Sequence, residues 1–275
     1  MSEKKIFIIG AGATASIVKL FCPNAKTIAP DGRSFLPIHY VWKTKYTVRF
    51  AKKFKIPYTE KTVSIFKGTK PHEITLYNEV THKPVGNKPS AGKKEFKTLI
   101  CNLPDFGIDI KETVIEISDD KIFTDKGVYE YDLVFICSPL LFRPFPKVNY
   151  YPMRIYKCET ELSRFPWDYA YLGGKLLEHN IYRASIETGH LFLEQAGDEE
   201  QNHTSIENWF GEFFGEHLII TTSFVNKFAH FDVPRQGYTD KNKMIFASRL
   251  SSLDNEFLFS DLIKKMYELR DKNVF

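Results

Sequence analysis

The sequence predicts an α/β protein in which a parallel-sheet domain is interrupted by a second, mainly antiparallel domain. Residues 5–9 form a short apolar run, which is typical of a strand buried on both faces of a parallel sheet. A glycine turn and a helix over residues 14–21 follow, and Pro23 ends the helix. Residues 26–29 form a second strand that ends at Pro30-Asp31-Gly32, a turn signal. The chain therefore opens with a β-α-β unit.

The middle of the chain has a different pattern, which predicts the second domain. From residue 48 to residue 97, short β-rich pieces alternate with segments rich in Pro, Gly and Lys. Residues 154–231 contain several strands and one helix over residues 205–214, which Thr204 or Ser205 caps. We therefore assign to the second domain residues 48–97 and 146–239.

The remaining segments return to the first domain. A β-meander over residues 113–130 leads into an apolar strand at residues 131–139. A strand over residues 244–247 and an amphipathic helix over residues 257–269 close the chain. The first domain therefore comprises residues 1–47, 98–145 and 240–275.

Composition excludes several function classes. The 275 residues carry a net charge of +4, and 43% of them are apolar. These values permit an anionic ligand but fall short of the clustered basicity of a dedicated DNA-binding protein. We therefore interpret the Lys-rich residues 52–55 and 88–97 as solvated loops, and nucleic acid is neither indicated nor excluded as a partner.

Cysteine and histidine spacing predicts no metal site. The cysteines, Cys22, Cys101, Cys137 and Cys158, form no CxxC pair, which argues against a zinc site and a disulfide framework. The histidines have no ligand spacing with Cys or acidic residues. We find no signal peptide and no apolar run of the ~18 residues that a membrane-spanning helix needs. We expect a cytoplasmic protein with no membrane partner, and its oligomeric state is left open.

The strongest motif is the turn Gly10-Ala11-Gly12-Ala13-Thr14-Ala15, which follows a predicted buried strand and begins a helix. Gly10 allows the tight turn, and Gly12 lets the backbone approach a pyrophosphate without an intervening Cβ. Ala15 is the small residue needed where the helix packs on the strand. The helix N-terminus offers free N–H groups and a positive dipole end to phosphates. The motif therefore predicts a Rossmann-type dinucleotide site.

The acidic residue that would bind the adenosine ribose is less well defined. Ala29 stands at the end of the second strand, where such a residue is expected. Asp31 lies two positions later. Because the helix is short, Asp31 could be displaced into the ribose-binding role, or it could be a turn residue without a ligand contact.

Three separated pieces of the chain resemble the flavoproteins that include UDP-galactopyranose mutase and the flavin amine oxidases. The first is residues 4–15, similar to that family's opening strand and glycine turn. The second is the meander followed by residues 131–139, similar to the family's strand that returns beside the cofactor. The third is residues 245–250, similar to the family's closing turn, whose backbone approaches the flavin ribityl and phosphate region. They occur in the expected order and, with the intervening domain, span most of the chain.

The resemblance implies a Rossmann-type FAD/NAD(P)-binding domain with an inserted, mainly antiparallel second domain, and FAD as the cofactor. Its match to the closing turn and returning strand implies cofactor contacts at Ser138, Ser248, Arg249 and Leu250. The chain departs from the family at Ser248 and Ala15, where Gly is usual, and is shorter than typical members. The segment after the second strand is reduced to Asp31-Gly32-Arg33-Ser34. Substrate identity therefore transfers poorly.

Two residues are candidates for catalysis. Arg183 lies in a segment that resembles a mutase-like strand on the substrate side of the flavin, where it could hold a phosphate or carboxylate. His39 follows the second strand and could reach the flavin face. The alternatives are an edge strand with surface charges for Arg183 and an ordinary packed or exposed histidine for His39.

The leading hypothesis is a flavoenzyme, either an oxidoreductase or a redox-neutral mutase-like enzyme, that acts on a small substrate. The net positive charge of the chain and the presence of Arg183 favour an anionic or nucleotide-linked substrate. A second hypothesis is an NAD(P)-dependent dehydrogenase, in which Arg33 would meet a 2′-phosphate. A third is a Rossmann protein that binds a nucleotide without catalysis, with a variant that serves nucleic-acid base modification in a phage-like pathway.

Overall fold

The computed structural model describes residues 4–31, 38–67, 94–138, 142–145, 150–164, 169–171, 179–187, 189–231, 240, 243–247 and 259–275. The chain divides into two compact units. Unit 1 comprises residues 1–61, 97–148 and 233–275, and unit 2 comprises residues 62–96 and 149–232. The predicted α/β class is confirmed, with a parallel sheet in unit 1 and antiparallel pairing in unit 2.

Unit 1 is built on a five-stranded parallel sheet with the strand order β16-β10-β1-β2-β6. Its strands are β1 (Ile6–Ile9), β2 (Lys26–Ala29), β6 (Ile110–Lys111), β10 (Leu133–Ile136) and β16 (Met244–Phe246). All four residues of β10, which lies between β16 and β1, are buried, as expected for a strand covered on both faces. The predicted β-α-β unit at the start of the chain is therefore present.

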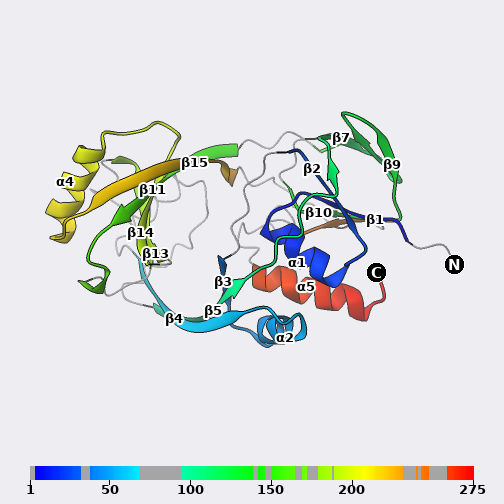
Figure 1. The fold of residues 1–275 in the computed structure, drawn as a ribbon, viewed down its shortest axis with the longest axis horizontal. Helices are drawn as coiled ribbons and strands as arrows, with labels where there is room; N and C mark the ends of the chain where they lie inside the picture. Colours follow the sequence, from blue (N-terminus) through cyan, green and yellow to red (C-terminus); the bar gives the residue numbers. More distant parts are fainter. Residues whose placement is uncertain are drawn as a thin grey trace. The chain divides into compact units, whose positions relative to one another are not determined.

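Two helices cover this sheet. Helix α1 (Ala13–Phe21) and helix α5 (Phe259–Asp271) contact each other and lie side by side along the sheet (Figure 1). Ile17 and Val18 of α1 and Ile263 of α5 are buried in one apolar cluster with the strand residues Ile8 and Phe135. A meander of three antiparallel strands completes this part of unit 1, namely β7 (Val114–Ile117), β8 (Lys121–Thr124) and β9 (Val128–Glu130).

A helix that the sequence analysis did not predict, α2 (Lys45–Lys53), also belongs to unit 1. Its Phe50 and Ala51 are 1% exposed and join the same apolar cluster. The boundary expected after residue 47 falls inside this helix, and residues 48–61 lie in unit 1. The interpretation of Lys52 and Lys53 as loop residues is therefore wrong, because they form the last turn of α2.

Strand β3 (Ile38–Trp42) precedes α2 in the sequence, and strand β4 (Tyr58–Lys67) follows it. Strand β3 pairs in antiparallel fashion with residues 98–102 of β5 (Lys94–Asn102). The C-terminal part of the stretch 88–97 is thus a strand rather than a loop, and residues 88–93 lie outside the described residues. Strands β4 and β5 each have residues in both units.

Unit 2 is a mainly antiparallel sheet. Its strands are the end of β4, β11 (Tyr150–Glu159), β12 (Tyr169–Tyr171), β13 (Ile181–Glu187), β14 (His190–Ala196) and β15 (Ile219–Phe231). They follow the order β15-β11-β14-β13-β12-β4, and only the β12–β4 pair is parallel among the described pairings of this unit.

Helix α4 (His203–Phe214) packs on the sheet of unit 2 through Ile206 and Phe210, which are fully buried. The predicted cap at Thr204 or Ser205 is wrong. The Asn202 side chain accepts a hydrogen bond from the Ser205 amide at 3.1 Å and caps the helix two residues earlier than expected. No helix among the described residues is both long and apolar enough to cross a membrane.

Candidate functional site

Gly10 stands at the carboxyl end of β1 in a conformation that favours glycine. Its φ is +109°, a region that L side chains rarely adopt. A Cβ atom at this position would lie 3.1 Å from the carbonyl carbon of Cys137 and from the amide nitrogen of Ser138. The Gly10 amide donates a 2.8 Å hydrogen bond to the Ile28 carbonyl of β2. Gly10 therefore packs tightly between the ends of two neighbouring strands.

Gly12 has the opposite surroundings. It is the N-cap of α1 with extended backbone, and a Cβ built there would meet nothing within 4 Å. No side chain caps this helix, and no acidic residue lies in its first turn. Ala13 and Ala15 pack on the apolar cluster, and Ala15 is 2% exposed. Ala11 precedes this first turn and Thr14 lies within it, and the turn has neither a side-chain cap nor a carboxylate that would compete with an anion for its N–H groups.

Three adjacent parallel strands end beside this turn. The Cys137 amide, after β10, donates to the Ile9 carbonyl at 2.8 Å, and the Ala247 amide, after β16, donates to the Ile136 carbonyl at 2.9 Å. Ser138 is the residue whose backbone and Cβ come against Gly10. The structure therefore brings Ser138 to the glycine turn, at the carboxyl edge where open α/β sheets bind ligands.

The end of β16 is held by two charged residues that the sequence analysis did not identify. Lys265 of α5 donates from Nζ to the Phe246 carbonyl at 2.8 Å and forms a 2.9 Å ion pair with Asp240. Asp240 Oδ1 accepts from the Phe246 amide at 3.0 Å. The sequence carries only a weak indication of this contact. Lys265 is a lysine among apolar positions of the closing helix, and nothing in the sequence relates it to Asp240.

Burial dominates the chemistry of the cysteine at this edge. It raises the pKa of the Cys137 thiol well above its ordinary value, and the nearby Lys265 charge opposes this shift only in part. A raised pKa disfavours the thiolate, which is the nucleophilic form of cysteine.

Asp31 lies just beyond the end of β2. Its side chain is 75% exposed and forms a 3.3 Å ion pair with Lys111 of β6. Ala29, at the last position of the strand, is buried. Asp31 is thus the first acidic side chain after β2, at the same edge of the sheet as the glycine turn. Arg33, Ser248, Arg249 and Leu250 lie outside the described residues.

The two candidate catalytic residues have specific partners. His39 of β3 is half-buried, and its ring meets Phe259 of α5 edge to face, with centroids 5.1 Å apart. In unit 2, Arg183 of β13 forms an ion pair with Glu194 of β14, directly across the strand pair, and Glu194 is 6% exposed. The Arg183 charge is therefore largely balanced by Glu194. The described residues contain no group of three or more His, Cys, Asp or Glu side chains placed to bind a metal ion.

The sequence matches no protein-family model and no curated protein. The structure is similar to glycine oxidase from Bacillus cereus, with a TM-score of 0.57 and 11% identity over 98% of this chain and 96% of that chain. It is also similar to a cofactor-binding variant of putrescine oxidase, with a TM-score of 0.56 and 8% identity over 98% of both chains. A tryptophan halogenase from Shewanella frigidimarina gives a TM-score of 0.55 and 8% identity over 98% of this chain and 71% of that chain.

These likenesses establish the fold. At 8–11% identity they show the fold alone, and the predicted Rossmann-type fold with a second domain is confirmed. They do not single out the mutase type named by the sequence resemblance.

Proposed function

We propose that this protein is an FAD-dependent oxidoreductase whose unit 1 holds the FAD pyrophosphate at the turn formed by residues 10–14. The observation that carries the proposal is the contrast within this turn. Gly10 is packed against Ser138, whereas Gly12 faces open space at an uncapped helix N-terminus. The likeness in fold to FAD-binding oxidoreductases over nearly the whole chain supports the same assignment.

The residues at the turn suit a pyrophosphate. The free N–H groups and the positive dipole end of α1 attract anions. The first turn of the helix has no carboxylate to repel phosphate, and the space above Gly12 admits a close approach to the backbone. Ser138 offers a hydroxyl at the same edge. When bound, the flavin supplies the redox chemistry, and the protein supplies position and electrostatics.

The structure weakens the argument that Arg183 binds an anionic substrate. The Arg183 guanidinium, which suggested an anionic substrate, is paired with the buried Glu194. Truncating Glu194 would leave that charge unbalanced, so we assign Arg183 and Glu194 to the stability of the β13–β14 pair. We therefore propose oxidation of a small molecule and retain no preference for an anionic one on the basis of Arg183.

The test is the cofactor itself. The purified chain is incubated with FAD and passed through a gel-filtration column, and the absorbance of the protein peak is recorded before and after denaturation. We expect flavin bands that co-elute with the wild-type protein and are lost in Gly12→Val, because the added side chain occupies the space of the pyrophosphate. The matched control is Gly127→Val in the β8–β9 turn, where the nearest atom to an added Cβ is the Tyr129 hydroxyl oxygen at 3.6 Å. It should keep the flavin.

Two results would contradict the proposal. A wild-type protein that binds NADPH but cannot be reconstituted with FAD would favour the dehydrogenase hypothesis. A flavin that binds but is not reduced anaerobically by any of a panel of amines, amino acids and sugar nucleotides would favour a binding protein without oxidoreductase activity.

A further inference from the structure

Helix α2 presents a strongly basic face to solvent. Lys45, Arg49, Lys52 and Lys53 are exposed, and the helix contains no Asp or Glu. Its apolar face, with Phe50 and Ala51, is buried in unit 1. The four cations follow one another at positions i, i+4, i+7 and i+8, so they spread over about 12 Å of helix at 1.5 Å per residue.

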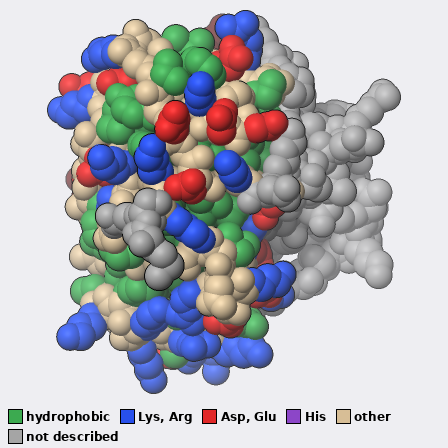
Figure 2. Space-filling view, turned by 90° about the vertical axis from the view of Figure 1, so that its right-hand side faces the viewer, with side chains coloured by type: hydrophobic (Ala, Val, Ile, Leu, Met, Phe, Trp, Pro, Cys, Tyr) green, Lys and Arg blue, Asp and Glu red, His purple; other side chains and the backbone are tan. Residues whose placement is uncertain are grey.

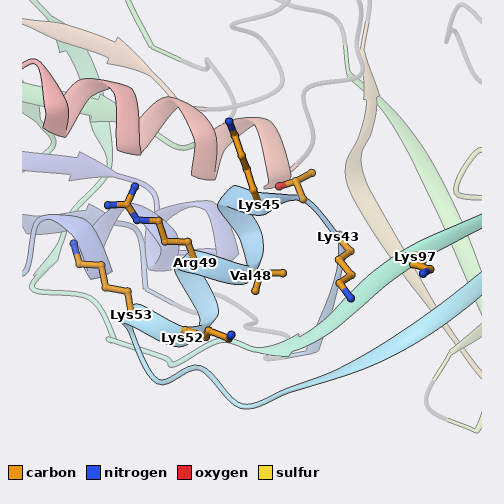
Figure 3. A pocket seen from close by; sticks show the side chains of 8 residues that line it. Lys43, Lys45, Val48, Arg49, Lys52, Lys53 and Lys97 are labelled. Carbon is orange, nitrogen blue, oxygen red and sulfur yellow. The ribbon is translucent and has the colours of Figure 1, made fainter.

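A wide, open depression of about 980 Å³ lies along this face. It is lined by Lys43, Thr44, Lys45, Val48, Arg49, Lys52, Lys53 and Lys97. We call these residues the basic depression. Figure 3 shows the α2 side chains on one side of it and Lys43 and Lys97 on the other. The latter two are joined by a 2.9 Å hydrogen bond from the Lys43 amide to the Lys97 carbonyl.

Few acidic side chains balance this charge. Lys43 pairs with Glu60 at 2.5 Å, whereas Lys45, Arg49, Lys52 and Lys97 form no ion pair with a described residue. Figure 2 shows Lys and Arg side chains gathered in the lower part of the molecule, where α2 lies in Figure 1.

The cations at one end of the helix are close enough to repel one another. The Arg49 guanidinium lies 4.7 Å and the Arg270 guanidinium 4.8 Å from the Tyr267 ring centroid, and Lys53 Nζ lies 6.0 Å from it. Partial burial lowers the pKa of Lys53, and Arg270 and Arg49 lower it further, against an opposing effect of Asp271. A bound polyanion would relieve this repulsion.

We propose that the basic depression binds the phosphate backbone of a nucleic acid without reading its sequence. A row of cations about 12 Å long exceeds one phosphate group and suits several phosphates in succession. Five of the six cations are lysines, which bind phosphate as flexible point charges rather than through the bidentate geometry that fixes a carboxylate. Contacts of this kind position a backbone and carry no base information.

The surroundings favour this occupant over a membrane. A helix that binds a bilayer inserts an apolar face into it, but the apolar face of α2 is buried in the core of unit 1. The large apolar side chains that are exposed among the described residues, Phe106, Ile115, Val128, Ile219 and Phe224, do not line the depression. Val48, the apolar residue among those that line it, is half-buried and packs against the core of unit 1, so it offers little surface to anchor in lipid.

The experiment measures fluorescence anisotropy of labelled 20-nucleotide single strands and 20-base-pair duplexes of mixed sequence over a series of salt concentrations. For the duplex, log K should fall with log salt with a slope of about −4.5 if five cations contact phosphates, from about −0.9 per contact. In Lys45→Gln/Lys52→Gln the magnitude of the slope should fall by about 2, and affinity at 0.1 M salt should fall more than about tenfold. Glutamine keeps a helix propensity close to that of lysine.

The matched control is Lys26→Gln/Lys243→Gln, which removes two exposed lysines of unit 1 outside the depression. It should keep the wild-type slope and affinity, and all three proteins should unfold at the same temperature. The proposal is overturned if the wild-type chain does not bind either nucleic acid at 50 mM salt, or if both double variants weaken binding equally. Binding to vesicles with anionic lipid, but to neither nucleic acid, would also overturn it. None of these outcomes depends on whether the chain binds FAD.

Discussion

Two helix N-termini of unit 1, those of α1 and α2, are capped in opposite ways. At α2, the Thr47 amide donates to the Thr44 hydroxyl at 3.2 Å, and the Thr44 amide donates to the Thr47 hydroxyl at 2.8 Å. This reciprocal capping box satisfies two backbone donors within the chain. At α1, the N-cap is Gly12, and no side chain takes the place of a cap.

This difference separates two ways of attracting an anion. At α1 the donors are backbone N–H groups whose positions are fixed by Gly10 and by the parallel strands, so the site has a defined shape. At α2 the N-terminus is closed, and the positive charge comes from long side chains that can follow a ligand of variable shape. We infer that the first suits a cofactor held in one pose and the second a flexible polyanion.

The largest loss of stability is expected from changing the glycine that fixes the α1 turn. Gly10→Ala should lower the free energy of unfolding by about 2–4 kcal/mol, because alanine is strained at φ +109° and its Cβ would meet the Cys137–Ser138 backbone at 3.1 Å. Urea denaturation followed by circular dichroism measures this change.

Gly12→Ala is the matched control, because its Cβ meets nothing within 4 Å and its φ is −86°. We expect its free energy of unfolding to stay within about 1 kcal/mol of the wild type. Equal losses in the two variants would show that the packed and open glycines do not differ as described.

The contrast between the helices also explains which of them could be read from the sequence. The α1 turn combines an apolar strand, closely spaced glycines and a helix within a few positions, so the local pattern sufficed. Helix α2 was missed because its lysines masked a weaker signal. Thr47, Phe50, Ala51 and Phe54 follow the i, i+3, i+4, i+7 spacing of a buried helix face, and this pattern could have identified it.

Other features depend on contacts that no local pattern contains. The pair Arg183–Glu194 exists because β13 and β14 align these two residues, and a slip by one residue would turn one of them to the opposite face. Lys265 and Asp240 meet at Phe246 only after α5 has packed on the sheet. The sequence could therefore indicate where the cofactor turn lies, but not the partners that neutralise a candidate catalytic residue.

A change at the closed helix should have a smaller effect than the change at Gly10. Thr44→Ala removes the hydroxyl that accepts a hydrogen bond from the Thr47 amide. We expect this change to lower the free energy of unfolding by about 1 kcal/mol. The flavin that co-elutes with the protein should be unaffected, because Thr44 caps α2 and not α1. Loss of flavin in Thr44→Ala at a temperature where the protein stays folded would contradict the division of roles between the two helices.

The smallest change in stability is expected at Asp31, where the α1 site meets the end of β2. The ion pair with Lys111 joins side chains that are 75% and 61% exposed, and exposed pairs of this kind contribute little. Asp31→Asn should therefore change the free energy of unfolding by less than about 0.5 kcal/mol.

The affinity of Asp31→Asn for FAD is more informative than its stability. If Asp31 accepts a hydrogen bond from the adenosine ribose, Asp31→Asn should weaken FAD several-fold, since a hydrogen bond to a charged group contributes about 1.5–3 kcal/mol, of which asparagine keeps part. FMN carries the flavin and one phosphate but no adenosine, so its affinity should not change. Equal affinities of wild type and variant for FAD would make Asp31 a turn residue. The pyrophosphate assignment at Gly12 would then stand without a ribose contact from this side chain.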